Sequence, residues 1–510
     1  MPRTFAHRME FSMSMKRLRR AARSVLAFGV GLSALGHGAA GFAGPWIAPG
    51  DAGLRSDIQI LSDAGHLAAP VMTWPLSWGD IMASLDESGG DWAPAELAAL
   101  ARVRSRMQDE TRSGVARLGA HAALAEEPVR IRSFEDAPRA DGEIGFGVEY
   151  TGTWWAANAQ GQWVNDPRDG DDWRADGSYL GVALGNWMLA GTIGDRWWGP
   201  AWQSSLIMSS NARPIPAITL ERNLTTAPEW KLLRWIGRWD LVVMFGFLES
   251  DRAIRNAKFL GMRVDFRPLK NLEIGINRTA IFCGDTKPCG FGAFADVLVR
   301  GDSGNSNPNQ LGGFDIRWSG KALGAPYAVY LVMNGEDENG FLPTQWAGQF
   351  GGETWGHSPR LGTWRAFLEW VDTECDFRLY RSIRNDSGPG NGGCAYNHGT
   401  YQTGYRYKGR AIGHSFDGDS SVFTLGGMLT DNADNSWLVT LAVGNLNRRS
   451  ARASTTAVRK TRYRDVEVIH RRGLWLGELS LGLGYDFRED AISGAEDDNF
   501  RAFAEWGIRY

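Results

Sequence analysis

Apolar and polar residues alternate with a period of two along most of the chain after Gly142. In residues 143–155, isoleucine, phenylalanine, valine and tyrosine fall on one face of an extended strand, while glutamate and glycine fall on the other. The same alternation recurs in residues 260–267, 364–370 and 475–487. This pattern predicts a long series of β-strands.

Between Trp46 and Glu127 the apolar residues are instead spaced as on helices. The spacing predicts three short amphipathic helices, around residues 54–61, 81–85 and 97–107. Residues 115–141 have the composition of a linker. We therefore expect a helical segment and linker over residues 44–141, followed by a β-domain over residues 142–510.

The first residues have the pattern of an export signal. Basic residues between Lys16 and Arg23 precede an apolar stretch that ends at Leu35, and small residues follow as far as Ala43. A membrane anchor is the alternative, but about a dozen apolar residues fall short of the roughly 20 that a spanning helix needs. We expect residues 1–43 to be a cleaved signal peptide.

Apolar and polar residues alternate in the strands of both membrane barrels and soluble sandwiches. The position of the charges distinguishes the two folds. Aromatic residues gather near strand ends, and the face opposite the apolar one carries charge and glycine, as in a barrel with a polar interior. About 17 strands can be counted, and bacterial barrels contain an even number. The prediction is a closed all-β transmembrane barrel of about 18 antiparallel strands, preceded by a helical N-terminal element.

The C-terminal segment is typical of the strand that closes an outer-membrane barrel. The side chains expected on its apolar face include Phe500, Trp506, Ile508 and the last residue, Tyr510. The predicted location is therefore the bacterial outer membrane.

Charge and motifs exclude several functions. The formal net charge is −3 and no basic tract is present, so no nucleic-acid partner is expected. The chain contains no GxSxG, HExxH or glycine-rich phosphate motif. We expect no catalytic residues, no cofactor and no metal.

Four cysteines in an exported chain favour disulfides. Cys283 and Cys289 bracket a short polar segment and predict a clipped loop. Cys375 and Cys394 form the second candidate pair.

Sugar binding requires flat apolar faces beside polar groups. Two regions offer this combination: residues 195–202, and a long polar stretch, 335–360, expected to be an external loop. The candidate carbohydrate-binding residues are Asp195, Arg196, Trp197, Trp198, Trp202, Trp346 and Trp355. The structural alternative treats the first group as interfacial anchors with an internal Asp195–Arg196 pair, and the second as ordinary loop residues.

Four blocks of sequence, residues 49–81, 194–223, 251–280 and 309–318, resemble the Wzi family of capsule-assembly outer-membrane proteins. The resemblance implies an 18-stranded barrel with a helical bundle at its periplasmic mouth. It also implies a non-catalytic, lectin-like role in attaching capsular or related polysaccharide to the cell surface.

Two other functions remain open from the residues alone. A barrel of this width has an open lumen unless it is filled, which would make it a diffusion channel for small polar solutes. Residues 46–114 could also dock periplasmic export components. The expected partners are therefore extracellular polysaccharide, outer-membrane lipid and such components, and the expected state is a monomer.

Overall fold

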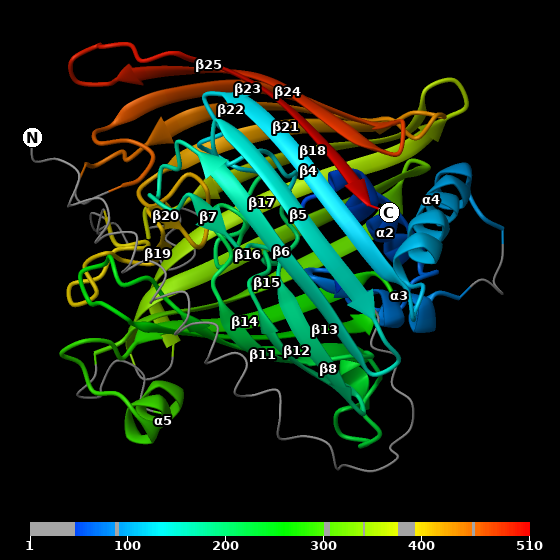
Figure 1. Cartoon of the computed structure of the whole chain (residues 1–510), viewed down its shortest axis with the longest axis horizontal. Helices are drawn as coiled ribbons and strands as arrows, with labels where there is room; N and C mark the ends of the chain where they lie inside the picture. Colours follow the sequence, from blue (N-terminus) through cyan, green and yellow to red (C-terminus); the bar gives the residue numbers. More distant parts are fainter. Residues whose placement is uncertain are drawn as a thin grey trace, which may run out of the picture. The chain divides into compact units, whose positions relative to one another are not determined.

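A computed structural model of the chain describes residues 46–86, 91–299, 307–339, 342–375, 393–450 and 454–509. The predicted signal peptide, residues 1–43, and Tyr510 lie outside these ranges. The described residues form one compact unit, built around a closed antiparallel ring of strands (Figure 1). The predicted barrel is confirmed.

Within the described residues the ring contains eighteen full strands and the two-residue strand β7 (Trp173–Arg174), and each strand pairs with its neighbours in chain order. The full strands are β4 (Ala116–Glu126), β5 (Gly142–Thr151), β6 (Trp155–Asn165), β8 (Tyr179–Leu184), β9 (Trp187–Thr192), β11 (Ala217–Arg222), β12 (Arg238–Phe247), β13 (Lys258–Leu269), β14 (Leu272–Phe282), β15 (Asn309–Ala322), β16 (Ala325–Asn339), β17 (Leu342–Ser358), β18 (Gly362–Asp372), β21 (Ser421–Thr430), β22 (Ser436–Leu446), β23 (Thr461–Leu474), β24 (Gly477–Asp490) and β25 (Asn499–Arg509).

The barrel begins earlier than the predicted boundary at Gly142. Strand β4 lies inside the segment that we expected to be a linker, and it pairs with β5 on one side and β25 on the other. Its outward face includes Ala120 and Ala122, and alanine gives little contrast with the polar residues between them. The alternation is therefore weak in this strand.

The last strand closes the ring as predicted. In β25, Ile508 lies opposite Ala120 and Ala502 lies opposite Glu126 of the first strand. Phe500 is 54% exposed on the outer surface, and Trp506 and Ile508 of the same strand are partly exposed.

Burial along the strands is inverted relative to a soluble sandwich. Many large apolar side chains are exposed on the outer wall, among them Ile144, Phe146, Leu220, Ile276, Leu368, Leu425, Val443 and Leu483. Charged side chains of the same strands are buried inside, among them Arg263, Asp265, Asp315, Arg317, Glu353, Arg365, Glu369 and Arg501. This arrangement suits a barrel that is surrounded by lipid and has a polar inner wall.

The two ends of the barrel differ in their connections. Short turns lie at one end: residues 270–271, 323–324, 359–361 and 475–476. Long connections lie at the other end and include residues 193–216, 373–420 and 447–460. Short turns face the periplasm in such barrels. Trp318, Trp364 and Trp437 are exposed on the outer wall near the short turns, as expected for an aromatic girdle.

Three helices lie at the short-turn end, where the helical bundle was predicted (Figure 1). They are α2 (Ala52–Ala64), α3 (Trp78–Ser84) and α4 (Pro94–Glu110). The Asp51 side chain accepts a hydrogen bond from the Leu54 amide and caps α2, which ends at Gly65 in the left-handed conformation. Among the described residues, no helix is long and apolar enough to cross a membrane.

A further helix, α5 (Phe291–Val299), packs on the outer wall of the barrel. It follows the Cys283–Cys289 disulfide and contacts β14. Three side chains that point outward by strand register are at most 3% exposed: Leu260, Ala280 and Phe282. They are covered because they form a cluster with Val297 of this helix.

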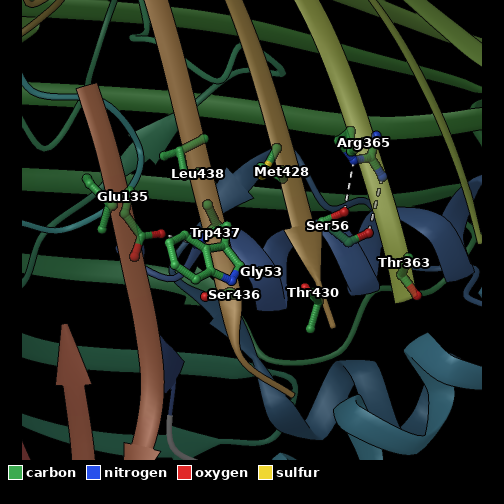
Figure 2. A pocket seen from close by; sticks show the side chains of 12 residues that line it. Gly53, Ser56, Glu135, Thr363, Arg365, Met428, Thr430, Ser436, Trp437 and Leu438 are labelled. Atoms are coloured by element: carbon green, nitrogen blue, oxygen red, sulfur yellow. Dashed lines mark hydrogen bonds between the residues drawn. The ribbon is translucent and has the colours of Figure 1, made fainter. Parts of the chain in front are cut away.

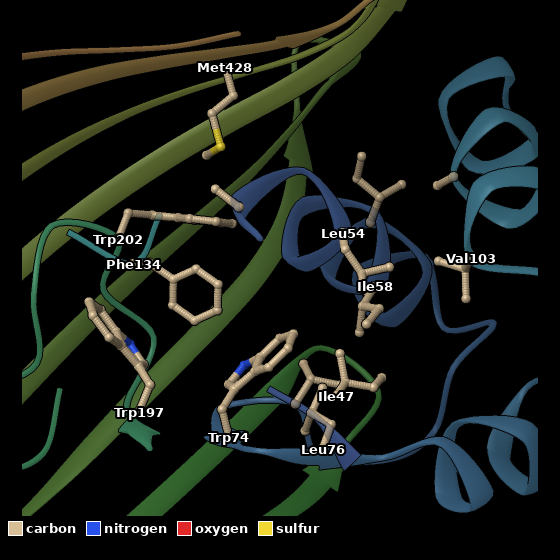
Figure 3. Close-up of a cluster of buried hydrophobic side chains, with 14 of the residues drawn as sticks. Ile47, Leu54, Ile58, Trp74, Leu76, Val103, Phe134, Trp197, Trp202 and Met428 are labelled. Carbon is tan, nitrogen blue, oxygen red and sulfur yellow. The ribbon is translucent and has the colours of Figure 1, made fainter. Parts of the chain in front are cut away.

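Polypeptide fills the barrel from both ends. Residues 46–85 enter from the short-turn end, and residues 126–141, 193–216 and 393–420 enter from the other. The two groups meet in one buried cluster that includes Trp74, Phe134, Trp197 and Trp202 (Figure 3). Strand β10 (Trp197–Trp198) pairs with β2 (Thr73–Trp74), so an outer loop is hydrogen-bonded to the N-terminal segment inside the lumen.

Arg55 of α2 joins these segments. Its guanidinium carbon lies 4.3 Å from the centroid of the Phe134 ring and 4.2 Å from that of Trp202. The same group donates hydrogen bonds to the carbonyls of Pro200 (2.7 Å) and Ala201 (2.9 Å). Burial lowers the pKa of Arg55 to about 9.

Charges of the wall hold the N-terminal segment in place. Arg317 donates to Asp63, and Arg365 donates to the Ser56 side chain at 2.9 Å. Glu273 accepts from the amides of Val71 and Met72 at 2.7 and 2.8 Å. These bonds compensate the desolvation of the wall charges.

We predict that Arg55→Ala weakens the packing of the plug. The substitution removes three cation–π contacts, with Phe134, Trp197 and Trp202, and leaves buried carbonyls unpaired. The expected cost is about 3 kcal/mol of unfolding free energy. Thermal unfolding of the purified protein in detergent measures the change. Arg112→Ala is the control, since the Arg112 side chain is 69% exposed; equal midpoints for the two variants would contradict the role of Arg55.

His414 makes the loop of residues 393–420 sensitive to acid. The side chain is fully buried, and burial lowers its pKa to about 3, whereas an unfolded histidine titrates near 6.5. The neutral form is therefore favoured in the folded state, and the packed loop loses stability as pH falls below about 6.5, by about 1.4 kcal/mol per pH unit. We therefore expect a protease to cleave this loop faster at pH 5 than at pH 7.5.

The His414→Phe variant tests the assignment. It removes the titrating group, so its rate of loop cleavage should change less over the same pH interval than that of the unmodified protein. An acid response that is identical in both proteins would assign the effect to other groups.

Candidate functional site

The three predicted tryptophans lie inside the barrel. Trp197 and Trp198 are 0% exposed and Trp202 is 3% exposed. The indole Nε1 of Trp202 donates to Glu353 at 2.8 Å, and its backbone amide donates to Glu369 at 2.5 Å. The interpretation of these tryptophans as interfacial anchors is wrong, and protein atoms already cover the faces that a sugar would need.

Asp195 and Arg196 are paired, but not with each other. Asp195 forms an ion pair with Arg139 at 3.2 Å, and Arg196 forms one with Glu221 at 2.5 Å. The predicted internal Asp195–Arg196 pair is therefore wrong. Burial raises the pKa of Asp195 to about 6 despite the nearby Arg139.

Trp346 and Trp355 lie on strand β17, not in the predicted external loop 335–360. Trp355 points inward and is 5% exposed, with the guanidinium carbon of Arg365 4.8 Å from its ring centroid. Trp346 lies on the outer face, and the centroid of its ring is 6.0 Å from that of the Phe314 ring. This stretch belongs to a long hairpin of β16 and β17. Its many glycine and glutamate residues led to the prediction of a loop.

The interior offers little space for a sugar. Figure 2 shows a cavity where α2 approaches β18, β21 and β22, lined by Ser56, Arg365 and Leu438 among others. Its volume is about 10 Å³, close to the minimum for one water molecule. This cavity is too small for a sugar, whereas a space of about 240 Å³ lies beside α4 at the periplasmic end. An external polymer would meet the barrel first at its outer opening.

Four cations gather at the outer opening around the β19–β20 hairpin (Arg406–Tyr407 and Arg410–Ala411). We call Arg130, Arg168, Lys408 and Arg410 the mouth patch. Arg410 donates to the carbonyls of Arg130 (2.9 Å) and Val129 (3.2 Å), which fixes the hairpin against residues 127–139.

Most charges beside the mouth patch are neutralised. Arg213 binds the carboxylates of Asp169, Asp171 and Asp176 at 2.7–2.9 Å, and Lys408 pairs with Asp171 at 2.5 Å. These pairs attach the connection between β6 and β8 to the outer connection 193–216 through Arg213, and to the hairpin through Lys408. Arg130 and Arg168 share one carboxylate, that of Glu127, at 3.3 and 3.0 Å.

Arg410 differs from its neighbours because, in the part of the chain that the structure describes, it has no carboxylate partner. Its hydrogen bonds go to neutral oxygens only. Burial and the nearby guanidinium groups of Arg132, Arg139 and Arg168 lower the pKa of Arg410 to about 9. A bound carboxylate would supply the missing counter-charge, with the paired geometry that guanidinium groups favour.

Both predicted disulfides are present, Cys283–Cys289 and Cys375–Cys394. The second begins the long loop that carries the β19–β20 hairpin, so it helps to position Arg410. A grouping of Glu336 with Cys375 and Cys394 has the spacing of a metal site, but the two cysteines are bonded to each other.

Comparison with known proteins identifies the family. The model of the capsule assembly protein Wzi family matches residues 115–461. The chain belongs to the Wzi capsule assembly family. Family membership and the closed barrel place the protein in the outer membrane, as predicted.

A solved structure of Wzi from Escherichia coli is similar over nearly the whole chain. The TM-score is 0.77 at 26% identity, covering 90% of this chain and 98% of the other. That protein is described as an outer-membrane protein involved in group 1 capsule assembly and as a carbohydrate-binding β-barrel.

An uncharacterized 55.8 kDa protein in the cps region of Klebsiella pneumoniae is 32% identical over 314 residues. The matched part covers 60% of this chain and 61% of the length of that relative.

The residues of the mouth patch were not singled out by sequence reasoning. Arg130 and Arg410 are 280 positions apart, and the bond between them depends on how two outer loops fold into the opening. The only available signal was the second cysteine pair, which marks the long loop as ordered.

We predict that Trp202→Phe lowers stability without affecting polysaccharide binding by this Wzi family member. Phenylalanine keeps an aromatic side chain, although a smaller one than indole, but the hydrogen bond from Nε1 to Glu353 is lost, which costs about 1–2 kcal/mol. Thermal unfolding and retention on a column of immobilised capsular polysaccharide measure the two effects. Trp173→Phe is the control, since Trp173 is 73% exposed; lost retention by a stably folded Trp202→Phe would restore the sugar-binding role of Trp202.

Proposed function

We propose that this protein holds capsular or related surface polysaccharide at the outer membrane without catalysing a reaction. Membership in the Wzi family supports this function. Further support comes from the similarity to an E. coli protein described as a carbohydrate-binding barrel.

The observation that carries the proposal is Arg410. It is a half-buried cation at the outer opening, surrounded by other cations and bonded only to neutral oxygens. The carboxylate of an acidic sugar residue satisfies this group, while the exposed Arg168 and the partly exposed Arg130 and Lys408 extend the favourable potential along a chain. The proposed ligand is therefore a polysaccharide that contains uronic acid or a similar acidic sugar.

The diffusion-channel alternative is disfavoured by the filled lumen. Two outer connections, residues 127–141 and 193–216, meet the N-terminal segment in a buried cluster across the interior. Wall charges are bonded to the N-terminal segment. A solute would have to displace this packed material.

We predict that Arg410→Gln reduces retention of acidic capsular polysaccharide by roughly 10- to 100-fold. The estimate corresponds to the loss of a charge-assisted hydrogen-bonded pair, about 1.5–3 kcal/mol. Binding of the purified protein to immobilised polysaccharide, with and without its carboxyl groups reduced, measures the effect. The reduced polymer should bind the variant and the unmodified protein equally.

Arg462→Gln is the matched control. It removes one positive charge at the same end of the barrel, from a side chain that is 59% exposed and paired with Glu489 at 2.6 Å. Retention should remain within about twofold of the unmodified protein. In cells, deletion of the protein should release capsule into the medium; a normally attached capsule in the deletion strain would refute the proposed function.

A further inference from the structure

One connection at the periplasmic end departs from the short turns around it. Residues 223–237 join β11 to β12, whereas neighbouring turns such as 270–271 and 323–324 have two residues. The connection contains a short 3-10 helix, η1 (Arg234–Ile236). We call its central part, residues 226–236, the tryptophan loop.

The tryptophan loop exposes an unusual amount of apolar surface. Trp230 is 62% exposed, Leu232 65%, Leu233 39% and Trp235 63%. The backbone is nevertheless folded, since the Leu233 amide donates to the Trp230 carbonyl at 3.0 Å and the Ile236 amide to the Leu233 carbonyl at 3.1 Å. These side chains are therefore displayed by an ordered turn, and an apolar environment must cover them.

The loop lies against the lipid-facing side of the wall. The Trp235 ring meets the Phe266 ring edge-on, with centroids 6.2 Å apart. Phe266 points outward from β13, because its neighbours Asp265 and Arg267 are the buried, inward-facing residues of that strand. The exposed surface of the loop is thus continuous with the apolar belt of the barrel, at the end where Trp318, Trp364 and Trp437 form the girdle.

Two cations interrupt the apolar residues. Lys231 and Arg234 are both exposed, and neither forms an ion pair within the described ranges of the chain. Segments that lie in a membrane interface have this composition, in which tryptophan and leucine alternate with lysine and arginine. Their aromatic rings lie between acyl chains and headgroups, and their cations lie at the headgroups. Long basic side chains reach headgroup phosphates while their stems stay in the apolar region.

We propose that the tryptophan loop anchors the barrel to the periplasmic leaflet by binding anionic phospholipid. Trp230, Leu232 and Trp235 insert at the boundary between acyl chains and headgroups, and Lys231 and Arg234 bind the phosphates. Continuity with the lipid-facing wall favours lipid over a periplasmic protein as the occupant. This site is distinct from the mouth patch and does not depend on the proposed polysaccharide function.

Spin labelling tests where the loop lies. The full-length Leu232→Cys variant carries one free thiol within the described chain, because its native cysteines there are all in disulfides. After labelling and reconstitution into vesicles of phosphatidylethanolamine and phosphatidylglycerol, relaxation by oxygen should exceed relaxation by a water-soluble nickel complex. Ala433→Cys, in the exposed β21–β22 turn at the same end, is the control and should show the reverse.

Two outcomes of this measurement overturn the proposal. Relaxation of the Leu232→Cys label mainly by nickel would place the loop in water. Low accessibility to both reagents would indicate that protein, such as a second copy of the chain, covers the loop.

Native mass spectrometry tests the role of the cations. The double variant Lys231→Gln/Arg234→Gln should retain several-fold less phosphatidylglycerol than the unmodified protein, with little change in phosphatidylethanolamine. The matched control is Lys321→Gln/Arg360→Gln, which removes two exposed cations at the same end, one from the end of β15 and one from the turn between β17 and β18. Equal phosphatidylglycerol retention by both double variants would exclude Lys231 and Arg234 as the phosphate ligands.

Discussion

The rest of the structure depends on the charges of the inner wall. A row of arginines and carboxylates lines the lumen, and most of these side chains are completely buried. A buried charge is costly unless it is paired and hydrogen-bonded. Polypeptide folded inside the barrel supplies the partners: Asp63 and Ser56 from one end, and the Trp202 segment from the other. The wall and its contents therefore form a single electrostatic unit.

This constraint also determines where function can reside. Groups that appear reactive or adhesive in the sequence, such as Trp197 and Trp202, are used to complete the interior. What remains for an external ligand is the rim, where outer loops fold back and leave Arg410 among other cations. The division between a closed interior and an open rim suits a surface anchor better than a channel.

The sequence predicted the barrel, its closing strand and the helical element, because strands such as β13 and β24 alternate between strongly apolar and strongly polar residues. It missed β4, where alanines weaken the contrast, and it placed Trp346 and Trp355 in a loop, because glycine and glutamate interrupt β17. The location of the candidate site residues was not predicted: Trp197, Trp198, Trp202 and Trp355 are buried inside the barrel, and their role in sugar binding stays a prediction. An apolar cluster inside a polar-walled lumen has the same local sequence as an interfacial girdle, and the approach of residue 410 to residue 130 depends on tertiary folding alone.

The pairing of β10 with β2 has a mechanical consequence. One strand belongs to a loop that starts at the outer rim, and the other lies in the segment that leads to the periplasmic helices. A pull on the outer connection 193–216 therefore acts on the β10–β2 hydrogen bonds and on the Arg55 contacts. Through them it reaches the segment that leads to the periplasmic helices. A polymer bound at the rim and dragged by flow would exert such a force, and these contacts would share it between the outer connection and the N-terminal segment.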